Sequence, residues 1–539
     1  MSTLRATLAV TLCLHLTSAV GYAQGPGVGF RIAGTNSSHD VIMFDNAGTV
    51  VHTWATAFQP GFGIALLDDG TLLRAIETTV VPGILGGTGG GIQRLALDGT
   101  VLWDWRHDTP GNVSHHDIEP LPNGNVLMIA WEDKSYAEGI AAGRDPALFN
   151  STVMRPDTVI EVRPTGPTTG AIVWEWHVWD HLIQDVDPIQ DNFGVIADHP
   201  ELVDVNFPPN ANGAIDWNHM NGIDYDPVHD LIVVSAHNQS EIWVIDHSTT
   251  TAEAAGSVGG ARGHGGDLLY RWGNPRVYGA GTTADQQLFG QHSPEFIGAD
   301  LPGAGNMLVF NNNAPGGSQV VEITPPQDGH GDYTLAGSGV FGPLAPTWTH
   351  AGGFHSPVLS SAQRLPNGNT LVCSGSQALI LEVRPDHSQA FSKDIGSGAF
   401  HVRYTERTLW ADTEQLSASA GGAVGFDLIG GSAQAGQSYY LLGSVSGTSP
   451  GFTKSGVHVP LNWDVYTDLT LAFANTAVLT NTFGSLDGVG RASASLNLAP
   501  GLLPPTAVGA VLRHAFVAVH PASSQLTWAS NAVDLLITP

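Results

Sequence analysis

A seven-residue phrase that ends in tryptophan returns four times in the first half of this 539-residue chain. Each copy starts with a turn glycine and continues as β-branched, aliphatic and aromatic residues, the composition of a strand that follows a tight turn. The copies are Gly48–Trp54, Gly99–Trp105, Gly170–Trp176 and Gly266–Trp272. Because recurrence at such intervals marks a repeat architecture, we expect several similar β-sheet units.

A second recurring pattern carries histidine. In each copy a histidine leads through a short strand to a hairpin turn, and an apolar strand and then a third strand follow. The histidines in this pattern are His116, His219, His292 and His355. The tryptophan phrase supplies the fourth strand of the earlier units, and we expect weaker equivalents near Tyr333 and Phe391. Four antiparallel strands per unit are typical of a β-propeller blade.

The repeats predict an all-β chain, with a six-bladed β-propeller over residues 24–407 and a small C-terminal β-sandwich over residues 415–539. The sixth blade is expected to join the N-terminal strands around 30–54 with a segment near 400–404, which closes the ring and removes exposed sheet edges. A seventh blade is the alternative. Two long polar insertions, residues 132–156 and 179–216, interrupt the repeats in the manner of functional loops.

The composition excludes some classes of function. The formal net charge of −29 argues against nucleic acid and anionic membrane surfaces as partners. Residues 1–23 have the pattern of a secretory signal, which predicts a secreted or periplasmic protein, and no later segment is apolar enough to span a membrane. Of the two cysteines, Cys13 lies in this signal, so Cys373 has no partner for an internal disulfide in the mature chain.

The recurring histidines indicate where the chemistry lies. The first strand of each blade lines the central channel, so His116, His219, His292 and His355 are expected to converge at one mouth of it. Imidazole acts near neutral pH as a nucleophile, a general acid or base, or a metal ligand. Asparagines surround these positions, at Asn221 and in the run from Asn311 to Asn313. The other interpretation is that they are buried structural histidines that bond backbone carbonyls.

Several longer phrases resemble the bacterial arylsulfate sulfotransferase family over roughly residues 30–405. They are Asp216–Tyr225, Ser235–Trp243, Tyr270–Asn274, Phe310–Asn313 and Arg364–Leu371. The resemblance implies a six-bladed propeller and a PAPS-independent transfer of a sulfuryl group from an aryl sulfate donor to a phenolic acceptor, with no cofactor. It also implies that an active-site histidine takes the sulfuryl group transiently.

The resemblance further assigns roles to residues. His355 is expected to be the nucleophile, and His219 and His292 to polarise the sulfate or exchange protons. The expected substrate-binding residues are His116, Asn221, His237, Asn238, Asn311 and Arg364.

The chain departs from the family pattern in one respect that bears on sulfate binding. Members of the family often carry an arginine in the region that corresponds to residues 310–318. In this chain residues 310–318 contain no arginine. Arg74, Arg271 or Arg364 is expected to replace it, or the family arginine is missing.

Two other functions stay open from the sequence. One is a non-catalytic secreted propeller that binds a glycan or a protein partner, since a fold does not fix a function. The other is a metal-dependent enzyme at the same mouth, although the axial histidines lack an evident set of Cys, Asp or Glu co-ligands and we expect no metal.

Overall fold

A computed structural model describes residues 25–36, 38–79, 86–149, 151–207, 215–328, 332–335 and 339–539. The predicted signal, residues 1–23, lies outside the described residues. The all-β prediction is confirmed: in the described ranges the α-helices are short and few, namely α1 (Tyr136–Ala141), α2 (Thr251–Ala254) and α3 (Val465–Ala472). No helix in these ranges has the length and apolar character needed to cross a membrane.

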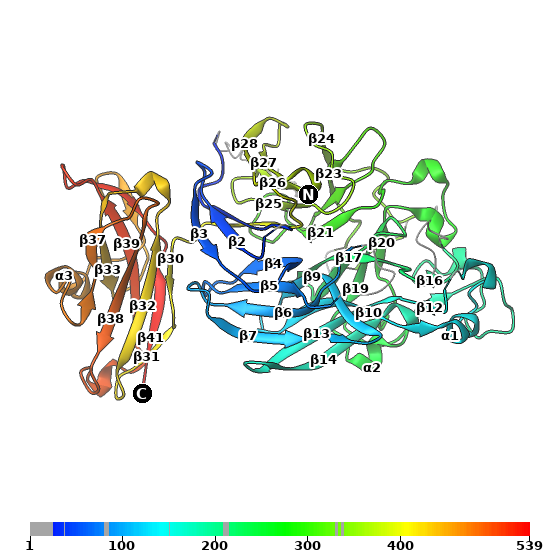
Figure 1. The fold of residues 1–539 in the computed structure, drawn as a ribbon, viewed down its shortest axis with the longest axis horizontal. Helices are drawn as coiled ribbons and strands as arrows, with labels where there is room; N and C mark the ends of the chain where they lie inside the picture. The colour runs from blue at the N-terminus through cyan, green and yellow to red at the C-terminus, as the bar shows by residue number, and fades with distance from the viewer. Residues whose placement is uncertain are drawn as a thin grey trace, which may run out of the picture.

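Six antiparallel sheets of similar design make up the larger part of the molecule (Figure 1). From the inside outwards, the first four are β29 (Val402–Thr405), β1 (Phe30–Gly34), β2 (Val41–Phe44) and β3 (Val50–Trp54); β4 (Pro60–Leu66), β5 (Leu72–Glu77), β6 (Gly90–Leu95) and β7 (Val101–Arg106); β9 (Asn112–Pro120), β10 (Val126–Glu132), β13 (Asp157–Gly166) and β14 (Thr169–His177), with β8 (Asp108–Thr109) beside β9; and β17 (Met220–Asp226), β18 (Leu231–Ala236), β19 (Glu241–Asp246) and β20 (Tyr270–Trp272). The last two are β21 (His292–Phe296), β22 (Met307–Asn311), β23 (Gln319–Ile323) and β24 (Trp348–Ala351); and β25 (Ser361–Arg364), β26 (Thr370–Ser374), β27 (Leu379–Val383) and β28 (Gln389–Asp394).

The inner strands of the six sheets form a closed ring. Each inner strand contacts the inner strand of the next sheet along the chain, and β29 contacts β4. The pairing of β29 with β1, in which Arg31 faces Tyr404, joins the two ends of this part of the chain in one sheet, as the sequence predicts. The ring therefore places the starts of all six inner strands around one axis.

The repeated tryptophans fasten each sheet to the next one. On the outer strands, indole N–H groups donate to backbone carbonyls of the following sheet or its loops: Trp54 to Ala96 (3.2 Å), Trp103 to Thr169 (3.1 Å), Trp176 to Gly266 (2.7 Å), Trp272 to Pro343 (2.7 Å) and Trp348 to Pro385 (3.1 Å). The Lys393 ammonium donates to Gly48 O (2.8 Å) between the last sheet and the first. The tryptophan phrase thus reflects a repeated link between sheets.

This link corrects one prediction about the fifth sheet. Its outer strand is β24, which begins at Trp348, whereas the sequence analysis placed it near Tyr333. Tyr333 instead stacks on Tyr270 of the preceding sheet, with ring centroids 4.7 Å apart. The Trp348 indole donates to the next sheet, and the segment that carries it pairs with β23 as the fourth strand. The expectation near Phe391 is confirmed, since that residue lies in β28.

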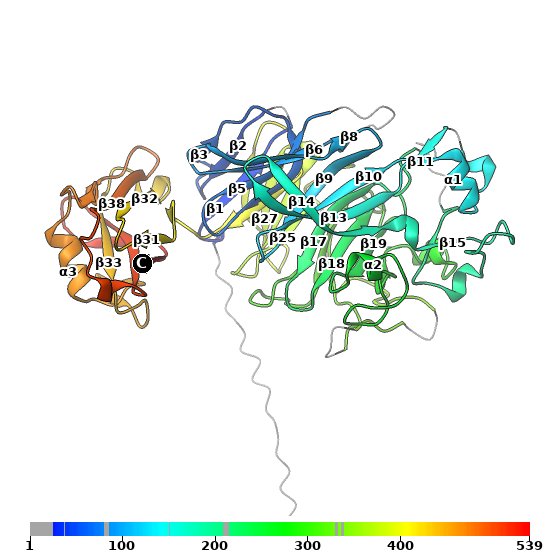
Figure 2. The same cartoon turned by 90° about the horizontal axis from the view of Figure 1, so that it is seen from below.

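The two polar insertions lie at one side of the ring (Figure 2). The first contains α1 and the hairpin of β11 (Lys134–Ser135) with β12 (Val153–Met154), and the second contains the parallel pair β15 (Leu182–Ile183) and β16 (Val203–Asp204). They are joined where the Arg144 guanidinium donates to Val205 O.

A second unit begins at Leu409, between the two predicted boundaries 407 and 415. One of its sheets contains β30 (Leu409–Ala411), β32 (Gly422–Ile429), β38 (Arg491–Leu498) and β36 (Leu479–Thr480). The other contains β31 (Gln415–Ser417), β41 (Val533–Thr538), β39 (Val511–Val519), β33 (Ser438–Ser444) and β37 (Phe483–Ser485), with β40 (Leu526–Ala529) beside β39. Apolar residues of both sheets, among them Phe426, Leu441 and Phe516, form one shared core.

Candidate functional site

Four histidines lie in contact at the starting ends of the inner strands. Ring centroids are 4.7 Å apart between His116 and His219, 5.2 Å between His219 and His237, and 5.4 Å between His237 and His292. We call these four residues the histidine arc. Of the four histidines predicted to converge, His116, His219 and His292 belong to this arc, whereas His355 has no ring contact with them. His237 joins them from the end of β18.

β-Bulges direct these side chains. The pairing of the inner strands β4, β9, β17 and β21 with their neighbours is interrupted by a register shift in each case. A non-glycine residue with positive φ lies at three of these interruptions: Phe62 (86°), His116 (51°) and Ser293 (47°). His219, also with positive φ (51°), directly precedes β17. Bulges re-aim side chains, and strained φ values of this kind cluster at functional sites. The repeated bulge explains why residues from different sheets meet in one place.

One member of the arc is set up to carry positive charge. His219 Nδ1 lies 2.5 Å from Asp216 Oδ2. Burial lowers the pKa of His219, but the charge and the hydrogen bond of Asp216 outweigh this and raise it above its ordinary value. The Trp131 indole donates to the other Asp216 oxygen at 3.2 Å. His219 is therefore the member of the arc that holds a proton most readily.

The other three members are held neutral. Burial, reinforced by the charge of neighbouring histidines, lowers the pKa of His116 and His292 well below the ordinary value and that of His237 to about 4. His292 has both ring nitrogens engaged: Nδ1 donates to Asn312 Oδ1 (2.8 Å), and Nε2 accepts from the backbone N–H of Leu359 (3.3 Å). The Nε2 atoms of His116, His219 and His237 have no hydrogen-bond partner in the described part of the chain.

His116 is connected to a buried carboxyl through its sequence neighbour. His116 Nδ1 lies 2.8 Å from His115 Nδ1, and His115 Nε2 lies 2.9 Å from Asp157 Oδ1. Burial, together with the charge of Asp216, raises the pKa of Asp157 well above its ordinary value. When Asp157 is ionised, His115 donates to it and His116 Nδ1 donates to His115, so His116 presents a lone pair on Nε2. When Asp157 is protonated, both hydrogen bonds reverse and His116 presents an N–H at Nε2. Sequence reasoning assigned no role to His115 or Asp157.

His355 lies beside the arc, without ring contact to its members. It is exposed, and its Nδ1 is 3.4 Å from Ser318 Oγ, which donates to Asn312 O (2.7 Å). Asn312 in turn donates to Ser356 O and Leu359 O, both at 2.8 Å. The segment that carries His355 is thereby fixed against the side chain that holds His292.

The predicted asparagines mostly position backbone. Asn221 Nδ2 donates to Gln291 O (3.0 Å), and Asn311 is bonded to the backbone of Gln287 and Phe289. Asn238 accepts from His237 Nδ1 (3.0 Å) and donates to Asp216 O (2.8 Å), so it supports two histidines of the arc. Asn312, the neighbour of the predicted Asn311, is the asparagine that contacts His292.

The three arginines expected to replace the family arginine lie elsewhere. Arg364 is at the far end of β25, where it pairs with Glu322 at 2.5 Å. Arg271 pairs with Glu241 at 2.5 Å, and Arg74 donates to Phe58 O at 2.8 Å and His39 O at 3.2 Å. Among the described residues, none of these three guanidinium groups hydrogen-bonds to the arc, so His219 supplies its positive charge.

A second polar chain lies below the arc. Ser293 Oγ is hydrogen-bonded to His401 Nε2, and His401 Nδ1 is 3.4 Å from Asp117 Oδ1. All three residues are buried. Burial and the nearby charge of Arg403 lower the pKa of His401 well below its ordinary value. This chain connects the arc to the other end of the channel.

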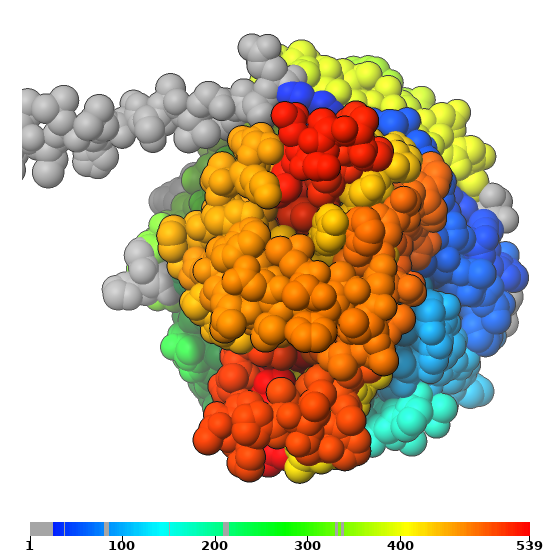
Figure 3. Space-filling model, turned by 90° about the vertical axis from the view of Figure 1, so that its left-hand side faces the viewer, coloured from blue at the N-terminus to red at the C-terminus, as the bar shows by residue number. Residues whose placement is uncertain are grey.

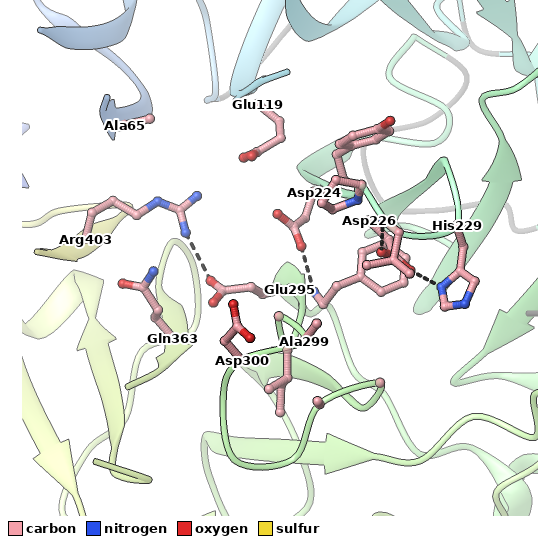
Figure 4. A pocket seen from close by; sticks show the side chains of 18 of the residues that line it. Ala65, Glu119, Asp224, Asp226, His229, Glu295, Ala299, Asp300, Gln363 and Arg403 are labelled. Carbon is pink, nitrogen blue, oxygen red and sulfur yellow. Dashed lines mark hydrogen bonds and ion pairs between the residues drawn. The ribbon is translucent and has the colours of Figure 1, made fainter. Parts of the chain in front are cut away.

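That other end opens into a cavity of about 750 Å³, which we call the far cavity (Figure 4). Carboxyl groups of Glu119, Asp224 and Glu295 face a single guanidinium, that of Arg403, which lies 3.0 Å from Glu295. Burial raises the pKa of Asp224 to about 7 and that of Glu295 to about 8. Buried carboxyl groups therefore dominate this end of the channel, whereas imidazoles form the arc.

No group of three or more His, Cys, Asp or Glu side chains within the described ranges has the geometry to hold a metal ion.

A family model described as arylsulfotransferase (ASST) matches residues 31–328, more than half of the chain. No curated protein matches this chain. One similar solved structure is a protein of unknown function from Bacteroides caccae, with 11% identity over 71% of this chain and 100% of that one and a TM-score of 0.40. Another is the periplasmic gluconolactonase PpgL of Pseudomonas aeruginosa, with 14% identity over 70% of this chain and 99% of that one and a TM-score of 0.37. A third is a catalytically inactive virginiamycin B lyase of Staphylococcus aureus with quinupristin, with 12% identity over 68% of this chain and 76% of that one and a TM-score of 0.28.

Proposed function

The chain belongs to the arylsulfotransferase family, and we propose that it is a PAPS-independent enzyme that moves a sulfuryl group from an aryl sulfate to a phenol through a sulfohistidine. Both substrates are small molecules, and the reaction needs no cofactor. The proposal includes export from the cytoplasm, which residues 1–23 predict. It also treats the six sheets as the blades of a six-bladed propeller and the C-terminal unit as a β-sandwich.

The observation that carries the proposal is the mixed charge of the histidine arc. Transfer of a sulfuryl group needs hydrogen-bond donors for the sulfate oxygens, a proton donor for the leaving phenoxide, and a neutral nitrogen that attacks sulfur. The imidazolium of His219 is a donor and a cation in a chain with a net charge of −29. His116 and His237 supply neutral imidazoles beside it.

The two half-reactions balance with these groups. In the first, a neutral imidazole nitrogen forms a bond to sulfur while the bond from sulfur to the aryl oxygen breaks. The electron pair stays on that oxygen, which takes the proton of His219. In the second, the acceptor phenol oxygen attacks the sulfohistidine sulfur, the nitrogen–sulfur bond breaks, and the phenol proton returns to His219.

We assign the nucleophile role to His355. Its imidazole is exposed, while its segment is fixed to Asn312 next to His292. His292 fits the role poorly, because both of its nitrogens are already engaged. His237 is the alternative within the arc, since it is neutral and its Nε2 is free of described partners.

The test is incubation of the purified mature chain with 4-nitrophenyl sulfate, with and without phenol, while nitrophenolate release is followed. Release that depends on phenol supports sulfuryl transfer. Release that is independent of phenol indicates a sulfatase, and no release contradicts the proposal.

A paired set of variants separates the arc from the rest of the channel. His219→Gln is expected to lower transfer about a hundredfold, the usual contribution of a general acid. His229→Gln is the matched control, because His229 lines the far cavity and pairs with Asp226. Equal activity in the two variants would remove His219 from the mechanism.

A further inference from the structure

The C-terminal unit contains a pocket of its own. Alternation along β33 sends Tyr439 and Leu441 into the core between the two sheets, and Tyr440 and Leu442 to the opposite face. That face is apolar too, although one face of an antiparallel sheet is commonly solvated. The hairpin of β34 (Phe452–Lys454) with β35 (Val457–Val459) and helix α3 border it, and a cavity of about 380 Å³ is left. We call this cavity the C-terminal pocket.

Aromatic side chains form the walls of this pocket. Tyr440 and Phe483 are stacked, with centroids 4.4 Å apart, and Phe452 and Trp463 meet edge to face at 5.1 Å. The Trp463 side chain is 47% exposed, which is unusual for so large an apolar group. Apolar residues complete the lining: Leu442, Leu471, Val517, Val519 and Leu526. Figure 3 views the molecule from the side of the C-terminal unit.

A lysine stands at the rim of the pocket. The chain of 539 residues contains three lysines, Lys134, Lys393 and Lys454. Lys134 pairs with Glu132 at 2.9 Å, and Lys393 is bonded to Gly48 O. Lys454 lines the pocket and has no ion pair or hydrogen bond with a described residue. A free ammonium is therefore placed beside an aromatic cavity in a strongly acidic protein.

We propose that the C-terminal pocket binds an aromatic anion, with the ring between the aromatic walls and the anionic group on the Lys454 ammonium. The volume lies in the range of small-ligand sites, and such sites combine apolar walls with a few polar groups that fix orientation. The aromatic pairs favour a flat ring over a saturated one, because aromatic faces and edges attract each other. Ser438, His520 and Ser524 also line the pocket, so polar groups stand beside the aromatic walls. The inference does not depend on the proposed transferase activity.

The experiment is calorimetric titration of the full mature chain with naphthalene-2-sulfonate. This probe carries its sulfur on carbon, so it has no sulfuryl group to transfer. We expect binding that is weakened about fivefold in Lys454→Met, the scale of an exposed ion pair. Trp463→Ala is expected to weaken it about tenfold through lost ring contact. Circular dichroism and thermal melting check that both variants fold.

Controls separate this pocket from other sites. Lys393→Met removes a lysine from a different part of the molecule and is expected to leave this binding unchanged. His219→Gln weakens binding of the probe at the histidine arc, so the binding that persists in this variant belongs to the C-terminal pocket. Naphthalen-2-ol and cyclohexanesulfonate are expected to bind at least fivefold more weakly than the probe. Binding that is insensitive to Lys454→Met and Trp463→Ala, equal binding of either comparison compound, or preferential binding of cellobiose would overturn the proposal.

Discussion

At His219, burial and a neighbouring carboxylate act in opposite directions on one imidazole, and the carboxylate of Asp216 prevails. The two residues are three apart in sequence, and the His219 backbone, which directly precedes β17, has a positive φ of 51°. The same burial acts on His116, His237 and His292 without a charged partner of this kind, so they stay neutral. One aspartate thereby differentiates four similar side chains.

This difference predicts a pH dependence. The folded pKa of His219 lies above the ordinary 6.5, so its proton is lost at a higher pH than that of an ordinary histidine. Transfer should fall in the same range. In Asp216→Asn the His219 pKa should drop, and the alkaline limb of kcat/KM should move to lower pH. A profile measured with 4-nitrophenyl sulfate and phenol checks this, and an unmoved limb would contradict the role of His219.

Some residues of the candidate site could be predicted from the sequence and others could not. Histidines at one register of a repeat predicted that His116, His219, His292 and His355 meet. The first three belong to the arc, whereas His355 has no ring contact with them. His237 was predicted as a substrate-binding residue, and the structure places it within the arc. The partners that set charge and proton position, Asp157 among them, come from different strands at no fixed sequence spacing, so pairing geometry alone identifies them.

Among the elements, the β-bulge in the inner strands decides how the site is built. The bulge residues are non-glycine with positive φ, a conformation that costs of order 1–3 kcal/mol each. Sequence patterns predicted the strands but not the bulges, because bulge residues such as Phe62 and His116 carry no turn signature. The outer strands were predictable from their tryptophans. The prediction of the fourth strand near Tyr333 was wrong because the tryptophan of that sheet, Trp348, lies outside the seven-residue phrase.

A glycine beside the bulge of β9 gives a test at this scale. Gly87 has φ +75°, and a Cβ there would lie 1.7 Å from His116 Cε1. Gly87→Ala should displace the ring and lower transfer about tenfold or more. Gly99→Ala is the matched control, with φ +88° and no atom within 4 Å of the added Cβ. Both should lose ~1 kcal/mol of stability from backbone strain, so equal activities would contradict the placement of His116.

The carboxyl layer formed by the inner strands predicts an unusual pH dependence of stability. The pKa of Asp224 is raised to about 7 in the folded state. Its protonated form therefore contributes stability that is fully present below the unfolded pKa of about 4 and is lost as pH rises through 7. Asp224→Asn keeps the acceptor for the Phe296 N–H (2.6 Å) and should flatten the decline. Thermal melting between pH 5 and 8 measures this; a slope equal to that of the unaltered chain would contradict it.

At the scale of the whole molecule, charge and function oppose each other. A net charge of −29 repels an aryl sulfate, and the local cation His219 must compensate. The closed ring puts the arc and the far cavity at opposite ends of one channel, which separates the proposed aryl sulfate site from most of the buried carboxyls. The ring closure was predictable from the repeats, whereas the acidic end was not, because its carboxyls lie on separate inner strands.

Salt should therefore assist substrate capture. Raising ionic strength from about 10 to about 150 mM shortens the screening length from roughly 30 to 8 Å. The KM for 4-nitrophenyl sulfate should fall severalfold while the KM for neutral phenol stays constant. Steady-state kinetics at several salt concentrations check this. A KM for the donor that rises with salt would show that attraction, not repulsion, dominates at the mouth.

The central claim is that a histidine in or beside the arc carries the sulfuryl group, with His355 as the assigned nucleophile. The most direct measurement is peptide mass spectrometry of the mature chain after brief reaction with 4-nitrophenyl sulfate in the absence of phenol, with digestion under alkaline conditions. The account predicts one added sulfuryl group on His355, which disappears when phenol is supplied before quenching. An active enzyme with no covalent adduct, or an adduct on a residue that is not histidine, would contradict it.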